Sequence, residues 1–177
     1  VGQTKEVQFS FDTKHGTDDY LEVISGKTAS LIRTSAKLGA MASNSSPELI
    51  ESISSWAWHS GIIFQITDDI LDLNSDTETL GKPAGNDILE GTYTLPVLLA
   101  LEKDRIKIED ILHQVKNSKI ELVEVLQEFN NDEIVEESNK FVNHHFKQSN
   151  EAIKNIEDKK ISNILNNINE YLLQRSN

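Results

Sequence analysis

The sequence contains the run Gly61-Ile62-Ile63-Phe64-Gln65-Ile66-Thr67-Asp68-Asp69-Ile70-Leu71-Asp72, an apolar segment that closes with three aspartates. The apolar part predicts a buried helix, on which Asp68 and Asp72 lie one turn apart on the same face with Asp69 beside them. Carboxylates near a helix C-terminus repel one another and meet the negative end of the helix dipole, so a bound cation explains them better than fold stability does. Magnesium is a hard ion that takes oxygen ligands and shares them with substrate phosphates. The segment therefore predicts an acidic, magnesium-dependent diphosphate site.

Start signals and apolar spacing predict helices on both sides of this segment. Ser46, Pro47 and Glu48 supply a hydroxyl cap, a proline at the first helical position and an acid facing the dipole, so a helix is expected over residues 47–73. Asp18 or Asp19 is expected to cap an earlier helix that runs to about residue 42. No strand-like alternation occurs, which favours one all-α domain of 177 residues. Residues 74–94 are expected to form a loop, and further helices are expected over residues 95–101, 106–115, 120–129, 134–156 and 161–173.

The last expected helix carries a narrow apolar stripe. Its members follow one another at spacings of 4, 3 and 4 residues and are Ile161, Leu165, Ile168 and Leu172. Such spacing places the four side chains on one face of a helix. The stripe predicts that this helix docks either on the core of its own chain, which is the simpler interpretation, or on a partner subunit.

Composition and charge disfavour several classes of function. The formal net charge of -12 argues against binding to nucleic acid, which needs a basic surface, and against attraction to anionic membranes. The absence of cysteine excludes disulfides, zinc–thiolate sites and cysteine nucleophiles, and it fits a reducing compartment. No apolar run approaches the roughly 20 residues of a membrane span, and no secretory signal is visible. We therefore expect a cytoplasmic protein with no transmembrane segment and no nucleic-acid partner.

Two lysines are expected near the aspartates. Lys82 belongs to the glycine-containing loop that follows them, and Lys27 lies within a mostly apolar helix face, where a charge is costly unless it is paired. Lys27 could instead extend along the surface and keep its head in water. Two ammonium groups, the Thr28 hydroxyl and three carboxylates suit a magnesium–diphosphate, because the metal bridges carboxylate and phosphate oxygens while lysines neutralise the remaining charge.

The histidines and tryptophans have simpler interpretations. His59 lies in the middle of the helix expected over residues 47–73 and is interpreted as a packed side chain. His144 and His145 are adjacent, and adjacent residues on a helix point about 100° apart, so joint metal binding by these two is not expected. Trp56 and Trp58 are interpreted as aromatics of the core or of a subunit interface.

Several motifs, taken in order, resemble one enzyme family. The segment 61–72, the loop Gly81-Lys82-Pro83-Ala84-Gly85-Asn86-Asp87 and the tripeptide Thr94-Leu95-Pro96 resemble the second aspartate-rich region of the trans-isoprenyl diphosphate synthases, the polyprenyl synthetase family. Lys27-Thr28-Ala29 and the later Ser35-Ala36-Lys37-Leu38-Gly39-Ala40 are similar to its Lys-Thr helix, and Gly2-Gln3 to the end of the preceding helix. The resemblance covers about residues 1–101 and, more weakly, the tail through Tyr171 and Arg175. It implies a helical bundle whose central cavity holds a prenyl chain.

The resemblance implies a role for each matching charged residue. Asp68, supported by Asp69 and Asp72, corresponds to the carboxylates that hold magnesium on the allylic diphosphate. Lys27 and Lys82 correspond to the lysines that clamp that diphosphate.

The resemblance also implies the reaction. Thr28 and Gln65 correspond to polar groups that line the reacting centre, so Lys27, Gln65 and Asp68 are the candidate catalytic residues. In this family an allylic diphosphate ionises, the double bond of isopentenyl diphosphate attacks the carbocation, and a proton is lost. Charge that develops on the leaving diphosphate is stabilised by groups fixed beforehand.

Two departures from the family pattern concern the expected partners and the part of the family domain that this chain contains. Thr92 stands where the family often has a lysine, which resembles the catalytic components of hexaprenyl and heptaprenyl synthases. We therefore expect a long-chain product and either a homodimer or a heteromer with a small regulatory subunit. The first aspartate-rich motif and its neighbouring basic residues, which in the family precede the position of Val1, are absent. Residues 1–177 are thus expected to form the C-terminal part of a single polyprenyl synthetase domain, which alone is expected to be inactive.

Two alternatives to a prenyltransferase follow from the same residues. The chain could be a non-catalytic helical subunit or a truncated fragment that keeps only one wall of the site. A terpene cyclase or a head-to-head synthase would share the helical cavity, but the loop over residues 81–96 and the Lys27-Thr28 pair argue against it.

Overall fold

The computed structural model describes residues 2–74 and 84–175, and every regular element in these ranges is a helix. In chain order the elements are α1 (Gly2–Gln8), α2 (Thr17–Ile24), the π-helical turn η1 (Ser25–Ala29), α3 (Ser30–Ala42), α4 (Pro47–Asn74), α6 (Asn86–Glu90), α7 (Leu95–Lys103), α8 (Arg105–Lys116), α9 (Leu122–Val125), the 3₁₀ turn η2 (Leu126–Glu128), α10 (Asp132–Ile153) and α11 (Lys159–Gln174). The prediction of an all-α fold is confirmed.

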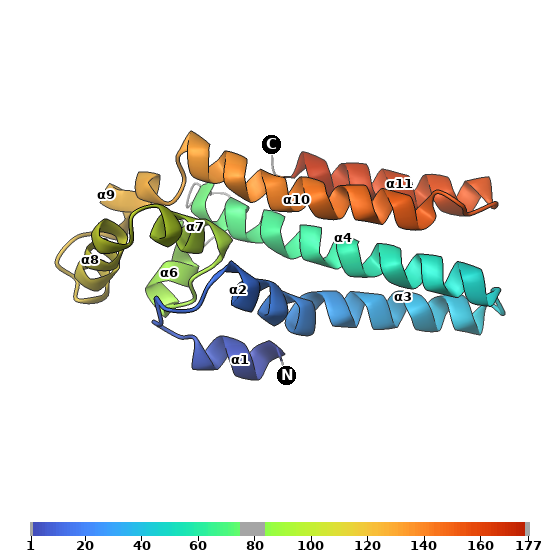
Figure 1. The fold of residues 1–177 in the computed structure, drawn as a ribbon, viewed down its shortest axis with the longest axis horizontal. Coiled ribbons are helices and arrows are strands. Elements are labelled where there is room, and N and C mark those ends of the chain that lie inside the picture. The colour runs from blue at the N-terminus through green and yellow to red at the C-terminus, as the bar shows by residue number, and fades with distance from the viewer. Residues whose placement is uncertain (1, 75–83, 176–177) are drawn as a thin grey trace.

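The long helices lie side by side in an elongated array (Figure 1). α2, η1 and α3 run end to end as one rod beside α4, α10 contacts α4 on another side, and α11 packs along α10 and also contacts α4. The short helices α6 to α9 gather at one end of the array, around the end of α4 that carries the aspartates. This arrangement leaves α4 in contact with most of the other long elements, which makes it the central helix.

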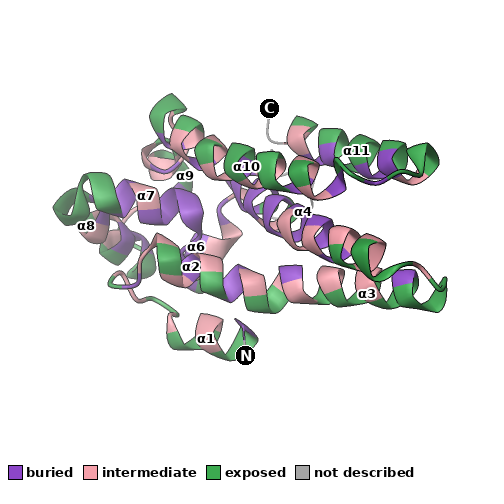
Figure 2. Ribbon diagram, turned by 45° about the vertical axis from the view of Figure 1, so that its right-hand side comes forward, coloured by how far each residue is buried: buried purple, intermediate pink, exposed green. Residues whose placement is uncertain are grey.

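The central helix begins and ends as its sequence signals predict. The Ser46 hydroxyl accepts a hydrogen bond from the backbone N–H of Leu49 at 3.2 Å, and the helix runs from Pro47 to Asn74. Many of its apolar positions are buried, as Figure 2 shows, although Phe64 is 37% exposed. Those nearest the aspartates join the main core and are Ile62, Ile63, Ile66, Ile70 and Leu73.

The turn that carries Lys27 and Thr28 is a π turn held between two glycines. A Cβ on Gly2 of α1 would lie 2.4 Å from the backbone nitrogen of Lys27, and a Cβ on Gly61 of α4 would lie 2.7 Å from the Cα of Ala29. Only glycine permits such close backbone approach on both sides. π turns are rare in helices and are frequently found at functional sites. The expected uninterrupted helix over this stretch is therefore corrected: tertiary packing on both flanks accompanies a local change of helix type.

Three details of the predicted elements are also corrected. The earlier helix begins after Gly16, whose backbone N–H donates to Asp19 Oδ2 at 3.0 Å, so Asp19 acts from the third helical position rather than as the cap. The helix expected over residues 120–129 is reduced to α9 and η2. The loop expected over 74–94 contains the short helix α6. The helices expected near 95–101, 106–115, 134–156 and 161–173 are present as α7, α8, α10 and α11.

The last helix docks on its own chain, through polar as well as apolar contacts. Leu165 and Leu172 of the predicted stripe are buried, whereas Ile168 is 39% exposed. Asn169 is fully buried, and its Oδ1 accepts hydrogen bonds from Trp56 Nε1 at 2.9 Å and from two serine hydroxyls, those of Ser60 and Ser149. The helix therefore packs on the core of its own chain, which was the simpler of the two predictions.

In the described part of the chain, no helix is both long enough and apolar enough to span a bilayer.

Candidate functional site

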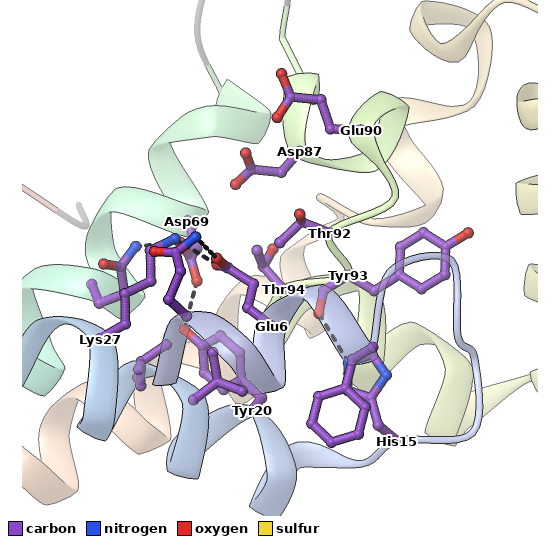
Figure 3. A pocket seen from close by; sticks show the side chains of 15 residues that line it. Glu6, His15, Tyr20, Lys27, Asp69, Asp87, Glu90, Thr92, Tyr93 and Thr94 are labelled. Atoms are coloured by element: carbon purple, nitrogen blue, oxygen red, sulfur yellow. Dashed lines mark hydrogen bonds and ion pairs between the residues drawn. The ribbon is translucent and has the colours of Figure 1, made fainter. Parts of the chain in front are cut away.

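One cavity of about 270 Å³ lies where the Lys27 turn meets the aspartate end of α4. Its walls come from α1, from α2 and η1, from α4, and from the segment over residues 84–94 (Figure 3). Charged side chains from each wall reach it, namely Glu6, Lys27, Asp69, Asp87 and Glu90. The motifs separated in the sequence thus meet at one site.

A chain of hydrogen bonds fixes the polar wall of this cavity. The Thr28 hydroxyl donates to Gln65 Oε1 at 2.7 Å, and Gln65 Nε2 donates to Asp69 Oδ1 at 2.9 Å. The Tyr20 hydroxyl donates to Asp69 Oδ2 at 2.6 Å. Since both carboxylate oxygens of Asp69 accept a bond, the orientations of Gln65 and Thr28 are set by a buried anchor.

Burial is the main cause of the shifted pKa of Asp69. Asp69 is 4% exposed, and loss of hydration raises its pKa to about 7, although the bonds from Tyr20 and Gln65 act to lower it. The nearby carboxylates of Asp87 and Asp68 raise it further. Burial, followed by the charge of Asp69, also raises the pKa of Tyr20 well above 10. In the isolated chain, Asp69 therefore changes protonation state near neutral pH.

Among the described residues that line the cavity, Lys27 is the only lysine. Its Nζ forms an ion pair with Glu6 Oε1 at 2.5 Å, and both side chains are partly exposed. The pKa of Asp87 is raised to about 6, first by burial and then by Asp72 and Glu90, while Lys27 acts in the opposite direction. Among the described residues that line the cavity, carboxylates outnumber lysines. A phosphate entering here needs additional positive charge.

The three aspartates of α4 do not converge. Asp68 is exposed, and its Oδ1 lies 3.4 Å from Arg175 Nη2, whereas Asp69 points inward to Tyr20. Asp72 is partly buried, and its Oδ2 accepts a long bond of 3.5 Å from the backbone N–H of Asp87. Within residues 2–74 and 84–175, no three His, Asp or Glu side chains form a metal-binding group. Helix geometry explains the divergence of Asp69, because adjacent residues point about 100° apart.

The carboxylates of α4 nevertheless suit a magnesium ion that is bound together with a diphosphate. Asp68 and Asp72 share a helix face, are not fully buried, and offer hard oxygen ligands. Magnesium is usually held by one or two carboxylates together with substrate phosphates, rather than by a cage made only of protein ligands. The residues therefore suit a magnesium ion that arrives with a diphosphate, and they suit an isolated ion poorly. The assignment of all three aspartates as ligands stays a prediction.

Of the remaining predicted site residues, Lys82 lies outside the described part of the chain. Thr92, which stands where the resemblance has a lysine, lines the cavity. Sequence reasoning did not single out Tyr20 or Glu6. Tyr20 could have been found from its spacing, since it lies seven residues before Lys27 on the same helix face.

Comparison with known proteins gives consistent matches. A sequence model of the family described as "Polyprenyl synthetase" matches residues 1–129. Component 2 of heptaprenyl diphosphate synthase from Bacillus subtilis (strain 168) is 33% identical over 138 residues, which are 78% of this chain and 40% of that protein. A short chain isoprenyl diphosphate synthase from Methanothermobacter thermautotrophicus is 32% identical and matches 98% of this chain and 54% of its own length.

A solved structure shows the same arrangement of helices. The crystal structure of heptaprenyl diphosphate synthase from Staphylococcus aureus superposes with a TM-score of 0.87 at 27% identity, over 99% of this chain and 56% of that one. The chain thus spans about half the length of the proteins that it matches over its whole extent.

Proposed function

The chain belongs to the polyprenyl synthetase family, and from that premise we propose that it supplies the allylic diphosphate-binding wall of a prenyltransferase. The reaction is the condensation of an allylic prenyl diphosphate with isopentenyl diphosphate. The observation that carries the proposal is the meeting of Lys27, Gln65 and Asp69 at one cavity. Gln65 donates to Asp69, and the hydroxyls of Thr28 and Tyr20 donate to these two side chains. A long-chain product is proposed from the name of the B. subtilis relative and from Thr92 at the cavity.

In this proposal each residue of the chain has a physical role. Lys27 exchanges its ion pair with Glu6 for a phosphate oxygen, which places an ammonium group on the leaving diphosphate. Gln65, fixed by Asp69 and Thr28, presents a polar amide to the reacting centre. Fixed groups of this kind stabilise charge that develops in the transition state without reorganising at that moment. Asp68 and Asp72 would hold magnesium, which when bound would supply positive charge that stabilises the leaving diphosphate.

We propose that the catalytic unit also needs a second helical part. The chain covers 54% and 56% of two relatives that it matches along nearly all of its own length. One of the named relatives is a "component 2", which supports a partner polypeptide. The partner or preceding segment would contribute the other metal-binding wall.

A binding experiment on the chain as it stands tests the proposal. Isothermal titration with farnesyl thiodiphosphate, with and without magnesium, should show binding that requires the metal. The variant Lys27→Met should bind at least about tenfold more weakly, since a charge-assisted hydrogen bond contributes about 1.5–3 kcal/mol. Lys37→Met, which removes a lysine of α3 that does not line the cavity, is the matched control.

Two outcomes would contradict the proposal. Absence of magnesium-dependent binding, or an equal loss in both lysine variants, would favour a non-catalytic helical subunit. In the full-length enzyme, Asp68→Ala should lower turnover by orders of magnitude while leaving the helical content unchanged. A folded Asp68→Ala enzyme with near-normal turnover would show that Asp68 is not a metal ligand.

A further inference from the structure

Two histidines that are far apart in the sequence meet between the long helices α4 and α10. His59 Nδ1 lies 2.9 Å from His145 Nδ1, and the ring centroids are 5.2 Å apart with the planes tilted by 40°. Both rings are partly buried, and the helices that carry them pack side by side (Figure 1). Neither histidine lines the cavity described above. His59 precedes Gln65 by six residues, or about 9 Å along the helix axis.

Burial favours the neutral form of both rings. Burial, followed by the proximity of His59 and His144, lowers the pKa of His145 to about 4, and burial followed by His144 lowers the pKa of His59. In a neutral pair one Nδ1 carries a hydrogen and donates it to the lone pair of the other Nδ1. Two imidazole ligands are thus available without removing a proton from a cation.

We propose that His59 and His145 bind one transition-metal ion of the zinc, nickel or copper type between α4 and α10. Imidazole nitrogens bind these ions at about 2.0–2.1 Å. Two ligands at right angles around a nickel or copper ion lie about 2.9 Å apart, which is the separation of the two Nδ1 atoms, whereas tetrahedral zinc would need them to open to about 3.3 Å. Since the two Nδ1 atoms face each other in a hydrogen bond, each ring must turn by about 45° for its lone pair to point at an ion that binds both at right angles. The hydrogen that was shared moves to the Nε2 of the same ring, so no net proton is released.

The proposed site differs from the magnesium site in chemistry as well as in place. Imidazole selects borderline metals, whereas magnesium prefers carboxylate and phosphate oxygens. His144 is exposed, and its ring stands edge-on to His145 at 5.2 Å. His144 is not a ligand of this site, because the side chains of adjacent helix positions diverge. An ion held by His59 and His145 would tie α4 to α10 and stabilise their packing in the native state.

Titration with nickel or zinc chloride at neutral pH, in the presence of excess magnesium, tests the site. The wild-type chain should bind one equivalent, and its thermal midpoint should rise with metal concentration. His59→Gln and His145→Gln should each weaken binding at least about tenfold, because even the loss of an outer-shell partner costs 10–100-fold. His144→Gln and His113→Gln, which change exposed histidines, should bind as the wild type does. Circular dichroism verifies the fold of each variant.

A measurement on the unaltered chain keeps the test independent of the variants. Substoichiometric nickel should broaden the imidazole C–H signals of two histidines, those of His59 and His145, before the signals of the others. Uniform broadening, or binding that survives both substitutions but is lost in His144→Gln, would overturn the proposal. The readout involves no prenyl substrate, so its failure is distinguishable from failure of the proposed function.

Discussion

Replacing the buried carboxylate Asp69 by the neutral isostere asparagine should stabilise the protein at high pH and have little effect at low pH. The pKa of Asp69 is about 7 in the folded chain, against a reference value of 3.8. The folded state therefore binds more protons than the unfolded state between about pH 4 and pH 7, and the free energy of unfolding falls as pH rises through that window. About three pKa units correspond to at most about 4 kcal/mol.

The surroundings can accept the amide of Asp69→Asn. Its oxygen can still receive the Tyr20 hydroxyl. The Gln65 amide can reverse so that its oxygen accepts from the new NH₂ group, and the Thr28 hydroxyl can then accept instead of donate. No buried polar group is left without a partner, so the change isolates the cost of the charge.

Urea unfolding of both proteins at several pH values between 4 and 8 measures the effect. The difference in unfolding free energy between Asp69→Asn and wild type should be small at pH 4 and should grow in favour of the variant up to about pH 8. Asp68→Asn, which removes one charge from an exposed neighbour, should change stability by less than about 1 kcal/mol at every pH. Parallel curves for wild type and Asp69→Asn would refute the reasoning.

Two further predictions concern the packing that positions the site. Gly61→Ala should destabilise the chain by about 1–3 kcal/mol in urea unfolding, because its Cβ would lie 2.7 Å from the Cα of Ala29. Gly39→Ala, where the new Cβ meets nothing within 4 Å, should instead stabilise it by up to about 1 kcal/mol, and equal effects would contradict the close contact. Asn169→Ala should lower the free energy of unfolding by at least about 2 kcal/mol, since the buried Trp56 N–H and the hydroxyls of Ser60 and Ser149 lose their acceptor. Urea unfolding followed by tryptophan fluorescence measures this loss, and a much smaller value would contradict the prediction.

Local signals located most helices and part of the site. The cap at Ser46 and the apolar run before the aspartates were sufficient to place α4, because both act within a few residues of chain. The same logic failed over residues 120–129, where helical spacing is present but the chain forms only short turns. The Lys27 turn was located correctly, yet its π geometry accompanies contacts from Gly2 and Gly61, which no local pattern reveals.

The sequence by itself determined the all-α fold, the central helix and the three aspartates at its end, because helical periodicity and caps are properties of neighbouring residues. Only the tertiary structure decided which aspartate faces inward, since that depends on Tyr20, which lies 49 residues away. It also decided that His59 meets His145 rather than standing alone, across 86 residues of sequence. The physical reason is common to both: periodicity fixes the direction in which a side chain leaves its helix, whereas its partner is set by the packing of distant helices.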